Sequence, residues 1–341
     1  MKVAQVMAGA PTGGAELFFE RLTTALHRAG DSVLPVIRRN EPRAARLARA
    51  GLAPRQLGFG GPADLLTGPR LRTLLRRFGP RVVVAWMNRA ASFTPPGDWV
   101  LAGRLGGYYD LDYYRRCDHL VGNTRGIVRW IAGQGWADRR VHYVPNFVDD
   151  LGGATPVSRQ SLGVPPDCKL VLALGRLHRN KAFDMLISAL PRLPGTHAVI
   201  AGEGPERADL LDAARREGVS DRLHLIGWRE DTGALLAAAD ALVCPSRHEP
   251  LGNVVIEAWS AGRPVVAAAS EGPRELITSD DGVLVPPGDP GALADALAHV
   301  LDDPARAASL TRTGRRRFET EFAEAPVVAR WREFLGAVEK A

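Results

Sequence analysis

Two cations in the second half of the chain have the setting of a phosphate site. Arg176 and Lys181 follow the apolar run 170–174 and precede a segment whose periodicity predicts a helix over 182–190. Fixed cations at the end of a strand, beside a helix N-terminus, suit the charge of a diphosphate. Lys181 is also one of four lysines in a chain that has 40 arginines. We therefore predict that Arg176 and Lys181 bind a diphosphate group.

Two carboxylates follow another predicted strand, 241–244. Glu249 lies in the loop after this strand, and Glu257 lies about one turn into the next predicted helix. Backbone N–H groups at a helix N-terminus are donors for an anion. The loop carboxylate suits the hydroxyls of a sugar, the amides suit a phosphate, and the carboxylate on the helix suits a ribose. The amides come from Leu251, Gly252 and Asn253.

A glycine-rich loop opens the first predicted helix. Residues 9–16 follow the apolar run 3–7 and include Gly13 and Gly14, which let a ligand approach the backbone beside free N–H groups. The loop lacks the GxGxxG pattern of dinucleotide-binding proteins, and no Gly-Lys-Ser/Thr follows it. The sequence therefore disfavours a nicotinamide enzyme and a P-loop NTPase.

The elements that must position these residues alternate between short β-branched runs and amphipathic segments. This alternation predicts an α/β fold with parallel sheets covered on both faces. It occurs twice, so we expect two Rossmann-like, doubly wound domains facing across a cleft, with ligands at the carboxyl ends of the strands. The expected domains are 1–150 and 151–325, with a linker over 149–166 and a C-terminal helix, 326–341, that returns to the first domain. The predicted strands are 3–7, 32–37, 82–86, 100–102, 119–122, 141–144, 170–174, 198–201, 223–226, 241–244 and 264–267. The predicted helices are 14–29, 42–50, 69–78, 124–134, 182–190, 205–217, 231–239, 254–261, 290–301 and 326–340.

Length and composition exclude several classes of protein. The chain has 341 residues, of which 45% are hydrophobic and 24% charged, and about 150 residues per domain is usual. No apolar run reaches the roughly 20 residues of a transmembrane helix, and the N-terminus lacks the pattern of a signal peptide. We therefore expect a cytoplasmic protein. Three cysteines without CxxC spacing argue against a disulfide framework and a structural zinc site.

Glu249 and Glu257 have the spacing of the E-x7-E pair, and nearly the whole chain resembles the retaining GT-B glycosyltransferases that use nucleotide sugars (glycosyltransferase family 4). That family includes many bacterial lipopolysaccharide and polysaccharide enzymes. The resemblance implies transfer of a sugar from a nucleotide-diphosphate sugar to a glycan or glycolipid acceptor, with retention of anomeric configuration and without a metal or other cofactor. Further segments that match the family are 13–16, 144–149, 174–184, 201–205, 244–246, 257–266 and 282–289.

The resemblance also assigns roles to residues. It makes Arg176, Lys181 and Glu249 the catalytic residues: the two cations neutralise the donor diphosphate, and Glu249 holds the hydroxyls of the donor sugar. Glu257 holds the ribose. Fixed cations and helix N-termini can stabilise the charge of a leaving diphosphate without a metal. The remaining donor-binding residues are Gly13, Gly14, Gly175, Leu251, Gly252 and Asn253, together with Gly202, Trp228 and Arg229 near the base.

The chain departs from the family pattern near the reacting centre. Many relatives carry a histidine at the end of a first-domain strand, but the strand over 82–86 continues here without one. Trp86 or Asn88 lies near the place of that histidine. Acceptor recognition belongs to the first domain in this fold. The candidate acceptor contacts are Asn88, Arg89, Arg104, Tyr108 and Tyr109.

The net charge of +6 is unevenly distributed. Residues 1–150 hold 22 Lys and Arg against 12 Asp and Glu, whereas residues 151–341 hold 22 against 26. The first-domain excess suits either an acidic acceptor or peripheral contact with an anionic membrane. Segment 69–78 has leucines on one face and arginines on the other, which is more typical of a surface helix with its apolar face in the core. No basic motif interleaved with aromatic residues indicates nucleic acid.

Two alternatives to the transferase remain at this stage. The missing histidine leaves open a non-catalytic subunit or sensor that binds a sugar nucleotide. A nucleotide-sugar epimerase or a phosphorylase could use the same fold, although the set of motifs argues against both. Donor binding without turnover would favour the sensor. The sequence carries no signal for an oligomeric state.

Overall fold

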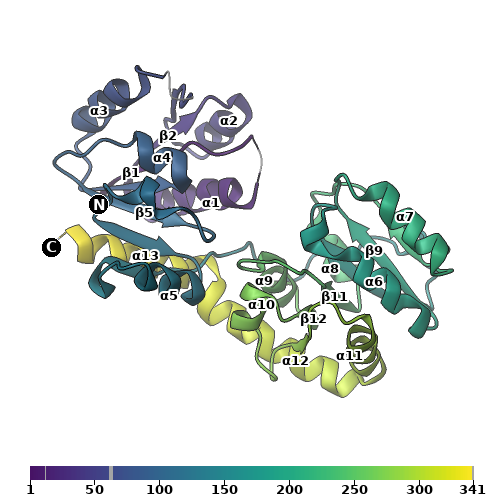
Figure 1. The fold of residues 1–341 in the computed structure, drawn as a ribbon. Helices are drawn as coiled ribbons and strands as arrows, with labels where there is room; N and C mark the ends of the chain where they lie inside the picture. The colour runs from purple at the N-terminus through teal and green to yellow at the C-terminus, as the bar shows by residue number, and fades with distance from the viewer. Residues whose placement is uncertain (12, 61–63, 340–341) are drawn as a thin grey trace. The chain divides into compact units, whose positions relative to one another are not determined.

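The computed structural model describes residues 1–11, 13–60 and 64–339, and the chain packs as two compact units. One unit is Met1–Phe147 with the last helix, α13 (Glu324–Glu339), and the other is Val148–Ala323. Each contains one parallel sheet with helices on both sides (Figure 1). The predicted α/β class, with two doubly wound sheets, is confirmed. The last two residues of the predicted C-terminal helix, 340–341, lie outside the described residues.

The first unit contains a seven-stranded parallel sheet in the order β3-β2-β1-β4-β5-β6-β7. Its strands are β1 (Lys2–Met7), β2 (Ser32–Arg38), β3 (Arg55–Leu57), β4 (Val82–Trp86), β5 (Val100–Leu105), β6 (His119–Gly122) and β7 (Val141–Tyr143). Its helices are α1 (Gly14–Arg28), α2 (Glu41–Arg49), α3 (Thr67–Phe78), α4 (Met87–Phe93) and α5 (Arg125–Gly133), with 3-10 turns at Leu111–Tyr114 and Asp138–Arg140. The central strands β1 and β4 are buried along nearly their whole length because both faces of the sheet are covered.

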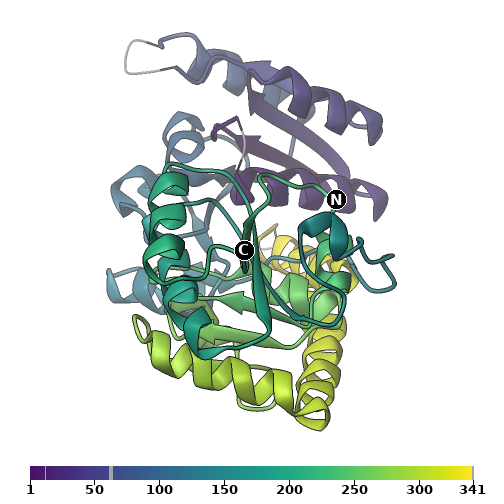
Figure 2. The ribbon, with the colours of Figure 1, turned by 90° about the vertical axis from the view of Figure 1, so that its right-hand side faces the viewer.

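The second unit contains a six-stranded parallel sheet in the order β10-β9-β8-β11-β12-β13. Its strands are β8 (Lys169–Leu174), β9 (Thr196–Ala201), β10 (Leu223–Leu225), β11 (Ala241–Cys244), β12 (Val265–Ala268) and β13 (Val283–Val285). Its helices are α6 (Phe183–Ala189), α7 (Arg207–Arg216), α8 (Thr232–Ala238), α9 (Asn253–Ser260), α10 (Glu271–Leu276), α11 (Pro290–Asp302) and α12 (Pro304–Arg317), with 3-10 turns at Gln160–Leu162, Arg179–Lys181 and Leu190–Arg192 and a π-helix at Phe318–Phe322. Figure 2 shows α11 and α12 as yellow-green helices alongside the green strands of this sheet.

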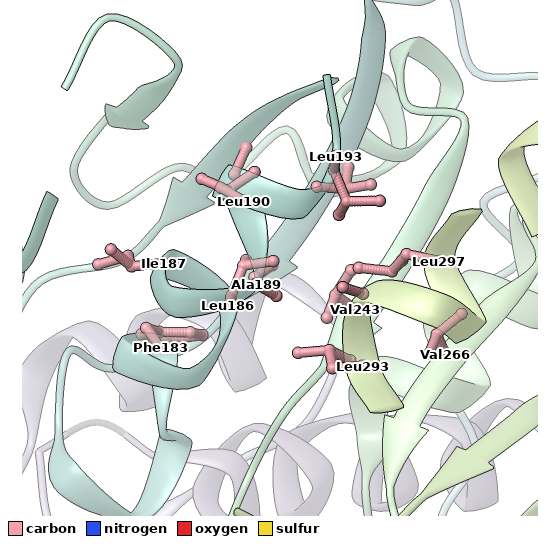
Figure 3. Packing of buried hydrophobic residues seen from close by; sticks show 14 of the residues in the cluster. Phe183, Leu186, Ile187, Ala189, Leu190, Leu193, Val243, Val266, Leu293 and Leu297 are labelled. Carbon is pink, nitrogen blue, oxygen red and sulfur yellow. The ribbon is translucent and has the colours of Figure 1, made fainter. Parts of the chain in front are cut away.

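One core cluster of the second unit holds α6 in place. Phe183, Leu186 and Ile187 recur at helical spacing on α6 and are buried, and they belong to the same cluster as Val243 on β11 and Leu293 on α11 (Figure 3). Burial of each such side chain contributes roughly 1.5–3 kcal/mol. The start of α6 is therefore anchored by its apolar face, and this anchoring positions the residues that precede the helix, including Lys181.

Helix α13 belongs to the first unit although it is the last element of the chain. Its apolar stripe is buried against helix α1 and the sheet. Within that contact the rings of Trp331 and Trp86 stack with centroids 6.4 Å apart. The buried residues of the stripe are Val327, Val328, Trp331, Phe334, Leu335 and Val338.

Several elements differ from the sequence predictions. Strands β3 and β13 have three residues each, too few to produce a recognisable alternation. Helices α4, α10 and α12 were not predicted. The segment predicted as a linker, 149–166, packs into the second unit, where Leu162 and Val164 are buried. A few apolar anchors in a Gly- and Pro-rich segment do not generate a periodic signal.

Helix α3 is an ordinary surface helix. Leu71 and Leu75 are fully buried, and the arginines of the helix are exposed. Among the described residues, no helix is both long and apolar enough to cross a membrane.

Candidate functional site

Lys181 and Glu249 form an ion pair in the second unit, between the ends of β8 and β11. Their side chains are 24% and 13% exposed, so the pair is shielded from bulk water yet accessible to a ligand. Ser246 donates a hydrogen bond from its hydroxyl to the Glu249 carboxylate at 3.4 Å. Burial lowers the pKa of Lys181, but the charge and the hydrogen bond of Glu249 outweigh this effect and raise the pKa above its ordinary value. Lys181 is therefore a fixed positive charge at neutral pH.

The backbone beside Lys181 allows close approach and is strained at one residue. A Cβ on Gly202 would lie 1.9 Å from the carbonyl oxygen of Gly175, so the ends of β8 and β9 can touch only because Gly202 has no side chain. Gly175 itself has φ +143°. Ala182 has φ +52°, in the left-handed region that alanine rarely adopts. Such strain persists where the surrounding contacts hold it, which is common at functional sites.

One side of the loop that carries Glu249 is fastened to the segment around Lys181. Arg247 makes two hydrogen bonds to the carboxylate of Asp184, at 2.9 and 2.6 Å. The backbone N–H of Arg247 also donates to the carbonyl oxygen of Asn180 at 2.9 Å. These contacts fix the loop after β11 against the loop after β8.

The other side of the same loop is fastened to α10. His248 contacts the carboxylate of Glu271 at 2.7 Å, and the N–H of Gly272 donates to the carbonyl oxygen of Glu249 at 2.8 Å. The loop then ends at Gly252, whose φ of +87° requires glycine, and α9 begins. Glu249 is thus supported from two neighbouring loops.

An exposed indole lies at the end of β10. Trp228 is 71% exposed. The preceding carbonyl, of Gly227, accepts a hydrogen bond from the N–H of Gly202 at 2.8 Å, so this loop lies beside the end of β9. Arg229 is paired with Asp231 at 2.7 Å. An exposed aromatic side chain in this place suits stacking on a nucleobase.

The structure brings together only some of the predicted donor residues of the second unit. Lys181 contacts Glu249, and Gly175 contacts Gly202. The carboxylate of Glu257, on α9, is close enough to help raise the pKa of Lys181. Arg176 is exposed and forms no ion pair with any other described residue. The predicted amide donors Leu251, Gly252 and Asn253 lie at the start of α9.

The predicted glycines of the first unit lie at the N-terminus of α1, in a loop held by buried charges. Gly14 is the first residue of the helix, and a Cβ on Gly13 would lie 2.4 Å from Glu16 Oε2. Glu16 is 4% exposed and accepts a hydrogen bond from the N–H of Ala10 at 2.7 Å. Arg43, which is 1% exposed, donates to the carbonyl oxygen of Ala10 at 3.1 Å. Ala10 is therefore held both from the helix, by Glu16, and from the neighbouring segment, by Arg43.

A pocket of about 700 Å³ opens at the carboxyl edge of the first sheet; we refer to it as the first-unit pocket. Two non-glycine residues of this region, Phe59 and Met87, have φ +44° and +64°. With Ala182 they are the three non-glycine residues with positive φ among those the structure describes. All three thus lie at or beside the two candidate sites. The pocket is lined by residues that include Ala8, Arg38, Asn88, Arg89, Tyr109 and Tyr113.

The structure distinguishes between the two candidates for the position of the missing histidine. Trp86 is fully buried and donates a hydrogen bond from its indole to Gln5 at 2.6 Å, so it belongs to the core. Asn88 lines the first-unit pocket and accepts a hydrogen bond from the hydroxyl of Tyr114 at 3.0 Å. Of the two side chains, only that of Asn88 faces the pocket.

The prediction that Arg104 contacts an acceptor is wrong for this structure. Its side chain is 1% exposed and lies over the rings of Phe18 and Trp86, at 5.3 and 5.0 Å from their centroids. It donates a hydrogen bond to the side chain of Asn146. Burial lowers its pKa to about 10. A guanidinium enclosed in this way supports the core and does not reach a ligand.

Tyr108 also lies apart from the first-unit pocket, with its ring edge-on to Trp130 at 5.5 Å. Sequence reasoning missed several residues that do line it, among them Arg38, Asp64 and Tyr113. Arg38 directly follows the predicted strand 32–37, so the rule that ligands bind at the carboxyl ends of strands could have identified it. Asp64 follows no predicted strand and carried no such signal.

Comparisons with known proteins agree with this architecture. Residues 168–303 match the profile of the glycosyl transferases group 1. The lipopolysaccharide core biosynthesis glycosyltransferases LpsE and LpsD of Rhizobium meliloti are 33% and 34% identical to the chain; the matches cover 99% and 95% of it, and the same shares of those proteins. The crystal structure of Anabaena HepE in complex with UDP superimposes with a TM-score of 0.85 at 21% identity, over 99% of this chain and 100% of HepE. The likeness to HepE identifies the fold as GT-B.

Proposed function

This chain belongs to the glycosyl transferases group 1 family of retaining glycosyltransferases, and we propose that it transfers a sugar from a nucleotide-diphosphate sugar to the core of a lipopolysaccharide. The similarity to LpsE and LpsD over nearly the full chain supports this acceptor. The Lys181–Glu249 ion pair is the observation that supports the donor side.

In the proposed reaction, the bond between the anomeric carbon and the diphosphate oxygen breaks, and the electron pair leaves with the diphosphate. An acceptor hydroxyl forms the new glycosidic bond on the same face, and its proton passes to the diphosphate oxygen that leaves. As the bond breaks, the leaving group gains negative charge, which Lys181 and Arg176 would stabilise. Lys181 is suited to this role because Glu249 keeps it protonated in a partly buried site.

Further donor contacts follow from the loops of the second unit. The second oxygen of Glu249 would hold a sugar hydroxyl, and Glu257 would hold the ribose. Trp228 would stack on the base. The donor diphosphate would also meet the N–H groups at the start of α9, where Gly252 opens the helix. Gly13, Gly14 and the candidate acceptor contacts belong to the first unit.

The charge set fits a reaction that does not depend on a metal ion. Fixed cations already stand at the place proposed for the diphosphate, where they would stabilise the charge of the leaving group. We expect transfer to continue in the presence of EDTA.

The test compares Lys181→Ala with Lys169→Ala. Both lysines flank β8, but Lys169 lies at its opposite end, in an exposed ion pair with Asp302. UDP-glucose, which was bound in a HepE structure, is the first donor to assay, followed by GDP- and ADP-sugars. Lys181→Ala should reduce transfer about 100- to 1,000-fold, as does removal of one preorganised charge-stabilising group, while Lys169→Ala should leave it unchanged.

Equal activity of the two variants would reject the assignment of Lys181. Thermal unfolding of each variant checks that the fold is intact. Calorimetric titration of the wild-type protein with the same nucleotide sugars addresses the sensor alternative: tight binding without turnover on any lipopolysaccharide core acceptor would reject the transferase function.

A further inference from the structure

The first-unit pocket contains two arginines that no carboxylate of the described chain neutralises. Arg38, the last residue of β2, is half-buried, and its guanidinium forms no hydrogen bond or ion pair within the described residues. Arg89, on α4, is exposed, and its guanidinium donates one hydrogen bond, to the carbonyl oxygen of Phe59 at 3.3 Å. Elsewhere on the chain, arginines are commonly paired with acids, as Arg43 and Arg46 are with Glu20.

Among the described residues that line this pocket, the one acid is already engaged. Asp64 accepts hydrogen bonds from the N–H of Gly60 at 2.7 Å, from the N–H of Thr67 at 3.0 Å and from the hydroxyl of Thr67 at 2.6 Å. These bonds, led by that of the Thr67 hydroxyl, lower the pKa of Asp64 to about 2. The carboxylate is thus occupied by Gly60 and Thr67, and two arginines against one acid leave the described lining of the pocket positively charged.

The other lining residues suit a sugar. Tyr109 and Tyr113 contribute aromatic rings with hydroxyl groups, and Asn88 contributes an amide. Aromatic faces pack on the C–H face of a sugar ring while hydroxyl and amide groups bond to its oxygens. The volume of about 700 Å³ lies within the range of small-molecule sites and exceeds what one sugar residue needs.

The backbone near Arg89 is strained at two residues. Met87, the first residue of α4, has φ +64°, and Phe59, whose carbonyl bonds to Arg89, has φ +44°. Left-handed conformations are unfavourable for residues with a side chain. Strain of this kind collects at binding sites, where neighbouring contacts maintain it.

From these observations we infer that the first-unit pocket binds an acidic sugar residue of the acceptor, whose carboxylate or phosphate is held between Arg38 and Arg89. This inference rests on the proposed function and specifies its acceptor. It also gives a local cause for the positive charge of residues 1–150, which hold 22 Lys and Arg against 12 Asp and Glu. Guanidinium groups bind carboxylate and phosphate with two parallel hydrogen bonds, so either anion fits.

The test uses three sugars that differ only in the substituent of one carbon: glucose, glucuronate and glucose 6-phosphate. Their binding to the whole protein, without donor, is measured by ligand-observed NMR. We expect glucuronate, glucose 6-phosphate or both to bind at least about tenfold more tightly than glucose, which corresponds to about 1.4 kcal/mol. Whichever of the two acidic sugars binds more tightly identifies the anion as a carboxylate or a phosphate.

Variants locate the site. Arg38→Gln and Arg89→Gln should each remove most of the tenfold preference, and Arg38→Lys should restore part of it because the charge is kept. Arg49→Gln is the matched control, since Arg49 lies exposed on α2 and outside the pocket. Thermal unfolding of each variant verifies that it is folded.

Three results would overturn the inference. The first is a wild-type protein that binds glucose as tightly as the two acidic sugars, or binds none of them. The second is a preference that persists in both Arg38→Gln and Arg89→Gln. The third is a loss of UDP binding in Arg38→Gln, which would assign the pocket to the donor. Because no turnover is measured, failure of the transferase function would appear separately, as absent transfer by a protein with intact acidic-sugar binding.

Discussion

The candidate sites of the two units differ in how far their cations are paired. In the second unit, Lys181 is paired with Glu249 and Arg247 with Asp184, whereas Arg176 forms no ion pair with a described residue. In the first-unit pocket, Arg38 and Arg89 face a space without an available acid. Both sites lie at the carboxyl edge of a parallel sheet, so the difference does not come from the fold.

This contrast is consistent with two kinds of ligand. A site with paired ions holds its groups in one geometry and keeps a lysine charged, which suits a diphosphate that every donor of this type shares. In a site with unpaired cations, the ligand itself supplies the neutralising negative charge, so the site selects anionic ligands. Substitutions at Glu249, His142 and Ala182 test the two sites and the sheets that carry them.

Removing the charge of Glu249 should have the largest effect. Glu249→Gln keeps the size and shape of the side chain but removes its negative charge. The pKa of Lys181 should then fall, because the carboxylate no longer offsets the effect of burial. We expect kcat/KM for the donor to fall about 100-fold or more. The loss should grow as pH rises, since Lys181 then loses its proton at lower pH than in the wild type. A pH–rate profile measures both effects.

Glu319→Gln serves as the control for that variant, since Glu319 lies in an exposed ion pair with Arg315. If Glu249→Gln lowers kcat/KM equally at all pH values and leaves the alkaline limb of the pH–rate profile unchanged, Glu249 does not act through the protonation of Lys181.

Acid should destabilise both sheets through paired histidines, and the first sheet more. On the neighbouring strands β6 and β7, Nδ1 of His119 lies 3.0 Å from Nε2 of His142. On β9 and β10, Nδ1 of His197 lies 3.0 Å from Nε2 of His224. Burial lowers the pKa of all four, and that of His142 to about 4. A lowered pKa of a histidine means that the unfolded chain binds more protons, so stability is full above about pH 6.5 and falls as pH drops toward 4.

His142→Gln should therefore reduce the acid-induced drop of the unfolding temperature, by the equivalent of about 1–3 kcal/mol. Thermal unfolding at about pH 7 and about pH 4.5 measures it. His224→Gln should give a smaller reduction, and the exposed His299→Gln should give none. A larger reduction for His224→Gln would reverse the expected order of the two sheets.

Relief of strain at Ala182 should give the smallest effect. Its φ of +52° suits glycine, so Ala182→Gly should raise the unfolding temperature, by the equivalent of about 0.5–1 kcal/mol. Ala296→Gly, inside α11, should lower the unfolding temperature by the equivalent of about 1 kcal/mol, because glycine is unfavourable in a helix interior. If Ala182→Gly instead lowers the unfolding temperature, the left-handed backbone of Ala182 does not destabilise the folded protein.

Much of the fold could be predicted because it depends on local patterns. Each β-branched run of the second half became a strand of the parallel sheet, except that Ile226 falls just after β10. The elements that were missed are short, or begin at an unusual backbone conformation, as α4 does at Met87. Lys181 and Glu249 could be named from type and spacing, but their contact could not, since 68 residues separate them.

Arginines of the first unit show where sequence reasoning ends. Arg104 and Arg38 both lie at the ends of β-strands and look alike in the sequence. One is enclosed by Phe18 and Trp86, and the other faces the first-unit pocket. Asp64 could balance the charge of that pocket but instead bonds to its own loop.

The sequence by itself determined the α/β class, the two parallel sheets and the residue types at the donor site, because periodicity and loop composition are local properties. Only the tertiary structure decided which charges are paired, which are buried and which face a pocket. Those outcomes depend on contacts between segments far apart in the chain, and the free energy of a charge depends on what surrounds it rather than on its neighbours in sequence.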